Sequence, residues 1–138
     1  MATLDTSILV DILRRRSGFH DRALAKLGEL RARGEVLATT CFTVAELYVG
    51  IELSNNPERD QADVEMLLSS LEILGFLGDS PRLFARIRAE QRRTGRLAGD
   101  GDVDTLIAAT SLAMGHSVLI TRNPSDFDHV PDLTVESY

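Results

Sequence analysis

The chain has 138 residues, of which 43% are hydrophobic and 26% are charged, a composition typical of one globular domain rather than a disordered chain. The single cysteine excludes an internal disulfide and a cysteine-rich zinc site. The first residues do not resemble a signal peptide, and no apolar stretch approaches the roughly 20 residues that a membrane helix needs. We therefore expect a soluble, cytoplasmic protein in which residues 1–138 form one domain.

The net charge of −6 argues by itself against a nucleic-acid partner, but the basic side chains are unevenly distributed. Residues 14–33 carry seven basic and two acidic side chains, a local charge of +5. Residues 82–96 carry six arginines and one glutamate, which is also +5. The planar guanidinium group of arginine suits phosphate. Both arginine blocks are equally consistent with the solvated faces of two amphipathic helices.

Hydrophobic periodicity predicts strands and helices in alternation along the chain. In chain order they are a strand at 2–4, helices at 6–13 and 20–33, a strand at 36–39, helices at 43–53 and 57–70, a strand at 73–77, helices from 80 and at 103–114, a strand at 117–121, a turn at 123–124 and a strand at 133–135. This alternation indicates the α/β class, with a mainly parallel central sheet flanked by helices on both faces.

Local signals set several helix boundaries. Gly34 is expected to stop the helix at 20–33. Thr43 and Glu46 have the spacing of a capping box, which would start the helix at 43–53. Asp102 is expected to be the N-cap of the helix at 103–114.

Acidic and amide side chains occur where the expected strands end. Asp5 directly follows the first strand, and Glu46 lies in the first turn of the helix that follows the second. Asp104 lies in the first turn of the helix at 103–114, and Asn123 and Asp126 follow the strand at 117–121. Because the carboxyl ends of parallel strands share one edge of a sheet, we expect these side chains to lie together. Clustered carboxylates repel one another unless a cation binds, and oxygen ligands favour Mg²⁺ or Mn²⁺ over zinc.

Each of these residues also has a structural explanation. Glu46 would be the reciprocal partner in the capping box, and Asp104 would favour a helix N-terminus. Asp126 would open a turn. Asp5 has the weakest structural explanation, because a carboxylate between a buried strand and an apolar helix is costly unless something binds it.

Four segments resemble the four motif blocks of PIN domains in order and spacing: Leu4–Asp11, Thr43–Leu47, Asp104–Thr110 and Ile120–Phe127. The chain length and the continuation Glu-Leu-Tyr-Val-Gly-Ile from Glu46 resemble the VapC toxin branch of that family. The resemblance implies a Mg²⁺-dependent endoribonuclease, with Mn²⁺ as an alternative ion, that acts as the toxin of a toxin–antitoxin pair. It also implies that Asp5, Glu46 and Asp104 are the acidic metal ligands.

The chain departs from the family pattern at the fourth acidic position. Many members carry aspartate where this chain has Asn123, whose amide brings no charge. We expect Asn123 to take part in catalysis and Asp126, three residues later, to supply the missing carboxylate to the metal. Thr6 and Thr121 flank the expected ligands and are placed to orient them.

The family resemblance further implies that metal-activated water hydrolyses an RNA phosphodiester, with no nucleophilic side chain. The arginine blocks would contact the RNA backbone without reading its sequence. A small VapB-like antitoxin and a homodimer are implied as well. The three histidines, His20, His116 and His129, are expected at the surface or in turns.

Two other functions fit parts of the same pattern. One is a non-catalytic RNA- or protein-binding module on the same fold, with a site weakened at Asn123. The other is a phosphatase that forms an aspartyl-phosphate on Asp5. Such phosphatases of the haloacid-dehalogenase type want a second aspartate two residues later, where this chain has Ser7.

Overall fold

Five short strands form the centre of the computed structural model, which describes residues 1–96 and 102–138. They are β1 (Ala2–Leu4), β2 (Leu37–Thr40), β3 (Glu72–Leu74), β4 (Val118–Ile120) and β5 (Thr134–Glu136). Their order in the sheet is β3-β2-β1-β4-β5, and all four neighbouring pairs are parallel. The predicted α/β class with a mainly parallel sheet is confirmed.

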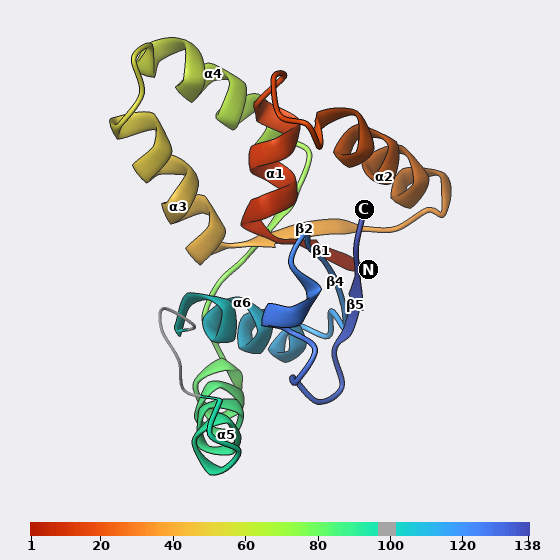
Figure 1. Cartoon of the computed structure of the whole chain (residues 1–138), viewed down its shortest axis with the longest axis vertical. Helices are drawn as coiled ribbons and strands as arrows, with labels where there is room; N and C mark the ends of the chain where they lie inside the picture. Colours follow the sequence, from red (N-terminus) through yellow and green to blue (C-terminus); the bar gives the residue numbers. More distant parts are fainter. Residues whose placement is uncertain (97–101) are drawn as a thin grey trace.

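Helices cover both faces of this sheet, as predicted (Figure 1). The described residues form α1 (Thr6–Leu13), α2 (His20–Ala32), α3 (Cys41–Glu52), α4 (Pro57–Leu68), α5 (Ser80–Arg93), α6 (Asp102–Ala113) and the 3-10 helix η1 (Pro124–Asp126). Helices α1 to α4 lie on one face, and α5 and α6 lie on the other (Figure 1). None of the described helices is both long enough and apolar enough to cross a membrane.

Strand alternation divides the apolar side chains between two cores. Leu4 and Ile120 point to the α1–α4 face and pack with side chains of those helices. Leu119 points to the other face and packs against α5 and α6. Thr3 also points to that face, where its Oγ1 lies 2.7 Å from Ser111 Oγ of α6. The central strands β2, β1 and β4 are therefore buried on both sides, as expected for parallel strands.

Two predicted helix starts are wrong in detail. Helix α3 begins at Cys41 and is capped by Thr40, whose Oγ1 accepts a hydrogen bond from Thr43 N–H at 3.3 Å. Thr43 therefore lies inside the first turn, and the capping box with Glu46 does not form. Helix α6 begins at Asp102 itself, so Asp102 occupies the first helical position rather than the N-cap.

Tertiary contacts explain two further differences from the predicted elements. The strand expected at 73–77 is shorter, because Phe76 leaves the strand and packs edge-on between Phe42 and Phe84, at centroid distances of 5.6 and 6.5 Å. His116, expected at the surface or in a turn, directly follows the turn at residues 114–115 but is only 2% exposed. Its carbonyl accepts a hydrogen bond from the Ser111 hydroxyl at 2.8 Å, which holds the end of α6 against the sheet.

Candidate active site

Asp5 lies at the point where β1 ends and α1 begins. Its side chain caps α1, and its Oδ2 accepts from Ser7 N–H at 3.4 Å, from Ser7 Oγ at 2.8 Å and from Thr121 Oγ1 at 2.8 Å. The residue is only 6% exposed. All three of these hydrogen bonds fall on one oxygen, so within the described residues Oδ1 has no hydrogen-bond donor. Asp5 is therefore held rigidly with one carboxylate oxygen left for a ligand.

Glu46 reaches the same edge from the first half of α3. Its carboxylate accepts a hydrogen bond from Thr6 Oγ1. The Thr6 hydroxyl also lies 3.3 Å from Thr43 Oγ1, which ties the start of α1 to the start of α3. The contacts expected of Thr6 and Thr121, each beside a predicted ligand, are thus present. Glu46 itself is exposed and can rotate toward a bound ion.

Asp104 lies in the first turn of α6, which α5 holds in place. The buried Gln91 side chain of α5 donates a hydrogen bond to Thr105 Oγ1 at 3.0 Å. Asp102, two residues before Asp104, is the other acid in this turn, and its carboxylate lies 2.8 Å from Arg88 Nη2. Asp102 therefore forms an ion pair with α5, while Asp104 is half-buried.

The electrostatics of Asp104 show that the acids gather. Burial is the main cause that raises the pKa of Asp104 to about 6, and the negative charges of Asp5, Asp126 and Glu46 raise it further. No cation among the described residues offsets this shift. Four carboxylates from β1, α3, α6 and η1 thus lie within electrostatic reach of one another. A perturbed acid of this kind is typical of a functional site.

The segment after β4 carries the remaining two candidate site residues. Asn123 is the N-cap position of η1, and its backbone N–H donates to Thr121 Oγ1 at 3.1 Å. Its amide side chain makes no capping hydrogen bond. Asp126 is exposed at the end of η1 and interacts with Asp104. Both residues therefore follow the strand whose Thr121 binds Asp5.

The chemistry of the gathered side chains, all of them oxygen donors, is that preferred by a hard divalent cation. Among residues 1–96 and 102–138, no three acidic, histidine or cysteine side chains lie close enough to ligate one ion together. Mg²⁺ normally keeps several water ligands and uses only one or two carboxylates, so a preformed cage of three is not required. The gathered oxygens, with no histidine or cysteine among them, match the preference of Mg²⁺ or Mn²⁺.

Comparison with known proteins places this arrangement in a family. The PIN domain family matches residues 2–133 of the chain. The chain belongs to the PIN-domain family. Among its relatives, Ribonuclease VapC2 of Haemophilus influenzae is 32% identical over 135 residues, which cover 98% of this chain and 96% of that protein. The resemblance of the motif blocks to VapC-type PIN domains is therefore confirmed.

Solved structures agree with this assignment. VapBC2 from Rickettsia felis, bound to a DNA fragment from its promoter, matches with a TM-score of 0.85 and 28% identity, covering 99% of this chain and 98% of that one. A toxin–antitoxin complex from Klebsiella pneumoniae matches with a TM-score of 0.69 and 27% identity, covering 97% and 96%.

A second buried acid of this PIN domain escaped the sequence interpretation. Asp11, at the other end of α1, is 2% exposed and accepts two hydrogen bonds from Arg122 Nη1, at 3.1 and 3.0 Å. Its carboxylate also accepts from Ser17 Oγ at 2.6 Å and from the Tyr138 hydroxyl at 2.8 Å. Burial and this hydrogen bond raise the pKa of Tyr138 far above its usual value. The sequence signal for Asp11 was an acid on the apolar face of a helix, but its partners lie far away in the chain.

Ion pairs within the PIN domain use part of both arginine blocks. Lys26 and Arg33 of the first block bind Glu136 of β5, at 2.8 and 3.3 Å. Arg88 of the second block binds Asp102. Other basic side chains of the two blocks have no ion pair within the described residues: Arg14, Arg15, Arg16, Arg22, Arg31, Arg82, Arg86 and Arg92. The structure thus pairs some members of each arginine block with acids and leaves others without an ion pair in the described part of the chain.

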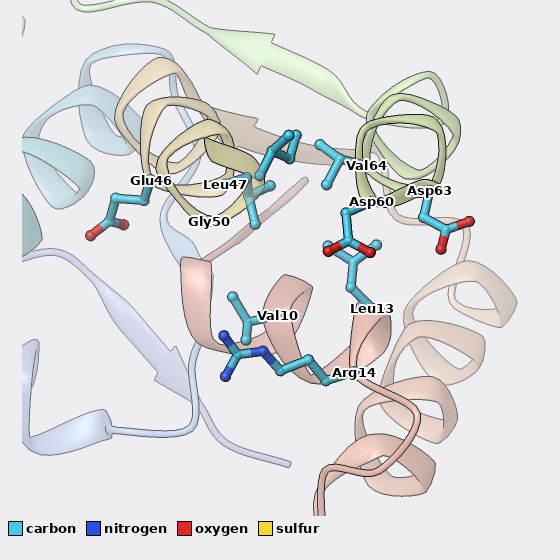
Figure 2. Close-up of a pocket in the computed structure, with 10 residues that line it drawn as sticks. Val10, Leu13, Arg14, Glu46, Leu47, Gly50, Asp60, Asp63 and Val64 are labelled. Atoms are coloured by element: carbon cyan, nitrogen blue, oxygen red, sulfur yellow. The ribbon is translucent and has the colours of Figure 1, made fainter. Parts of the chain in front are cut away.

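A groove beside the acidic cluster runs between α1, α3 and α4 (Figure 2). Its apolar lining comes from all three helices, with Val10, Leu13, Leu47, Ile51 and Val64. Glu46 lines one end and points away from Asp60 and Asp63 of α4 (Figure 2). Since Glu46 belongs to both the groove and the acidic cluster, the groove opens onto the candidate active site.

Proposed function

We propose that the chain is a metal-dependent endoribonuclease and the toxin of a VapBC-type toxin–antitoxin pair. The observation that carries this proposal is the group of four carboxylates that Asp104 forms with Asp5, Glu46 and Asp126, for which no compensating cation acts on Asp104 among the described residues. Burial, and then these three negative charges, raise the pKa of Asp104 to about 6. Kinship with Ribonuclease VapC2 supports RNA as the substrate. It also speaks against the aspartyl-phosphate phosphatase, whose second aspartate is absent from this chain.

In this mechanism Asp5, Glu46, Asp104 and Asp126 would hold Mg²⁺, directly or through its water ligands, with Mn²⁺ as an alternative. When bound, the ion would supply the positive charge that lowers the pKa of water and offsets charge on the phosphate. Asp5 offers its free Oδ1 while Ser7 and Thr121 fix its orientation through Oδ2. Such supporting hydrogen bonds orient a ligand and increase its basicity.

Two residues of the η1 segment have separate roles in the proposal. Asp126 restores the fourth carboxylate, which its electrostatic interaction with Asp104 supports. Asn123 is exposed and its amide makes no capping bond, so the amide is free to hold a water molecule or a phosphate oxygen. A neutral group at this position weakens binding of a second ion more than binding of the first.

The decisive experiment incubates the purified chain, freed from any partner, with total cellular RNA and either Mg²⁺ or EDTA. The Asp5→Asn variant is the matched control, because an amide oxygen still accepts from Ser7 and Thr121. We expect discrete cleavage products that require both the ion and Asp5. Intact RNA in every reaction, from folded protein, would favour the non-catalytic binding module.

We also propose that the antitoxin occupies the groove between α1, α3 and α4. Its apolar lining suits the nonpolar face of a peptide segment, and a segment lying there would reach Glu46 and cover the acidic cluster. Kinship with a toxin–antitoxin complex supports such a partner. We therefore propose together that the chain binds an antitoxin, cuts RNA and acts in the cytoplasm.

Gly50 allows a direct test of that groove. It lines the groove, and a Cβ added there would meet no atom within 4 Å. Gly50→Trp should fill the groove and prevent complex formation with a co-expressed antitoxin while RNA cleavage persists. Gly50→Ala, which adds one methyl group, should leave the complex intact. A stable complex with Gly50→Trp would place the antitoxin elsewhere.

A homodimer is the remaining part of the proposal. Ile73 of the edge strand β3 and Leu77 after it are 45% and 66% exposed, so this edge of the sheet presents apolar side chains to solvent. Light scattering during size-exclusion chromatography should give the mass of two chains, and Leu77→Lys should shift it toward one.

A further inference from the structure

Two arginines from distant parts of the chain lie on the same aromatic ring. Phe19, between α1 and α2, has the guanidinium carbon of Arg22 at 5.6 Å and that of Arg122 at 5.0 Å from its ring centroid. Both distances are within the range of cation–π attraction. The Phe19 ring therefore brings Arg22 of α2 and Arg122, which follows β4, together as one cationic surface.

Arg122 is fixed at two points. Its Nη1 donates to both carboxylate oxygens of Asp11, and its backbone N–H donates to Ser7 Oγ at 3.0 Å. The side chain is nevertheless 37% exposed. Within the described residues, its Nε and Nη2 have no hydrogen-bond acceptor. One edge of the guanidinium group is thus anchored, and the other edge is free to bind an anion.

The charge of this surface is not fully neutralised by its own neighbours. Asp11 balances Arg122, but Arg22 is exposed and forms no ion pair in the described part of the chain. Phe19 limits the conformations of both side chains, which reduces the entropy lost when they bind a ligand. The result is one excess positive charge and a preoriented row of N–H donors.

This cationic surface adjoins the acidic cluster. Ser7 Oγ accepts from Arg122 N–H and also donates to Asp5 Oδ2 at 2.8 Å, so a single hydroxyl connects the two. Asp5 and Asp11 lie six positions apart on α1, about 9 Å along the helix axis at 1.5 Å per residue. The free edge of Arg122 therefore lies beside the acids rather than among them.

We propose that Arg22 and Arg122 form a phosphate-binding subsite that takes a backbone phosphate of the RNA next to the one that is cut. This inference rests on the proposed ribonuclease function and assigns the residues that overcome repulsion between RNA and the acidic cluster. Guanidinium groups bind phosphate oxygens through two parallel N–H donors. The contact positions the RNA backbone and reads no base.

The test measures affinity for a short fluorescein-labelled single-stranded RNA by anisotropy over a range of salt concentrations. An Asp104→Asn background with Mg²⁺ prevents cleavage, so binding is observed separately from catalysis. The variants are Arg22→Gln and the double change Asp11→Asn with Arg122→Gln, which avoids leaving a buried carboxylate unpaired. Arg122→Lys keeps the charge for Asp11 but removes the free guanidinium edge. Arg31→Gln is the control, since it removes the same charge from the same helix as Arg22.

We expect Arg22→Gln and the double change to weaken binding about tenfold and to lower the slope of log affinity against log salt by about 0.7 for each phosphate that the variant no longer binds. Arg122→Lys, which keeps the charge, should weaken binding with a smaller change of slope. Arg31→Gln should leave the slope unchanged. Unchanged slopes in the test variants, with a parent that binds RNA, would overturn the subsite alone. A folded parent that fails to bind RNA would overturn the proposed ribonuclease function, and the subsite with it.

Discussion

Helix α1 carries a buried acid at each end, and the two acids have opposite surroundings. Asp5 is 6% exposed, receives hydrogen bonds from hydroxyl groups and a backbone N–H, and faces other carboxylates. Asp11 is 2% exposed and pairs with the Arg122 guanidinium. A buried carboxylate paired with a cation is stable by itself, whereas one that faces like charges needs a ligand to complete it. The comparison separates a structural acid from a functional one within a single helix.

The largest effect should come from removing Asp11, the acid that is paired with Arg122. Asp11→Ala leaves Arg122 without its partner and removes the acceptor for Ser17 and Tyr138. Removing one member of a buried ion pair typically costs about 3–5 kcal/mol of unfolding free energy. Urea denaturation measures this loss. Asp11→Asn keeps an acceptor and should cost less. A loss under about 1 kcal/mol for Asp11→Ala would mean that the cluster is not a structural anchor.

Asp5→Asn, at the start of α1, should have the opposite effect, with a large loss of activity and little loss of stability. RNA cleavage should fall by at least about 100-fold, above the usual effect of losing a supporting residue. The unfolding free energy should change little, because the amide oxygen still accepts from Ser7 and Thr121. Single-turnover cleavage and urea denaturation of the same preparation check both parts. Full activity in this variant would remove Asp5 from the mechanism.

The segment after β4 allows a paired comparison of Asp126 and Asn123. Asp126→Asn removes a charge that acts on Asp104, so the Mg²⁺ concentration for half-maximal cleavage should rise about tenfold. Asn123→Ala removes no charge and should lower the cleavage rate without that shift. Mg²⁺ titrations of both variants distinguish the roles. The reverse result would assign the fourth metal ligand to Asn123.

Ion binding should depend on pH through Asp104. Its pKa is raised to about 6 in the folded chain, and Mg²⁺ requires the ionised carboxylate. Mg²⁺ affinity should therefore fall about tenfold as the pH falls from about 7 to about 5, and binding at about pH 6 should release about half a proton per ion, because half of the Asp104 side chains are protonated there. Calorimetry in buffers of different ionisation enthalpy measures that release. Asp104→Asn should abolish it.

The smallest effect concerns the stability of the metal-free chain. A folded pKa of about 6, above the ordinary value of 3.8, means that ionisation of Asp104 destabilises the folded state as the pH rises through that range. Asp104→Asn should therefore stabilise the metal-free chain by about 1 kcal/mol near pH 7, with allowance for its partial exposure. Near pH 4 the difference should disappear. Thermal unfolding at both pH values, in EDTA, provides the measurement.

Much of the fold followed from local patterns in the sequence. Alternating apolar runs predicted the parallel sheet, because strand and helix periodicities differ within a few residues. The rule that parallel strands end at one edge then predicted that Asp5, Glu46, Asp104, Asn123 and Asp126 lie together. The negative charges of Asp5, Asp126 and Glu46 do act on Asp104 in the folded chain. These inferences need only neighbouring residues and the direction of each strand.

The tertiary structure decided what depends on contacts between distant segments. Asp11 meets Arg122 and Tyr138 across 111 and 127 positions of the chain, so no local pattern could predict its partners. The same holds for Phe76, which leaves its strand to pack against rings of α3 and α5. Local sequence determines which element a residue joins, while burial and charge pairing depend on what the fold brings against it.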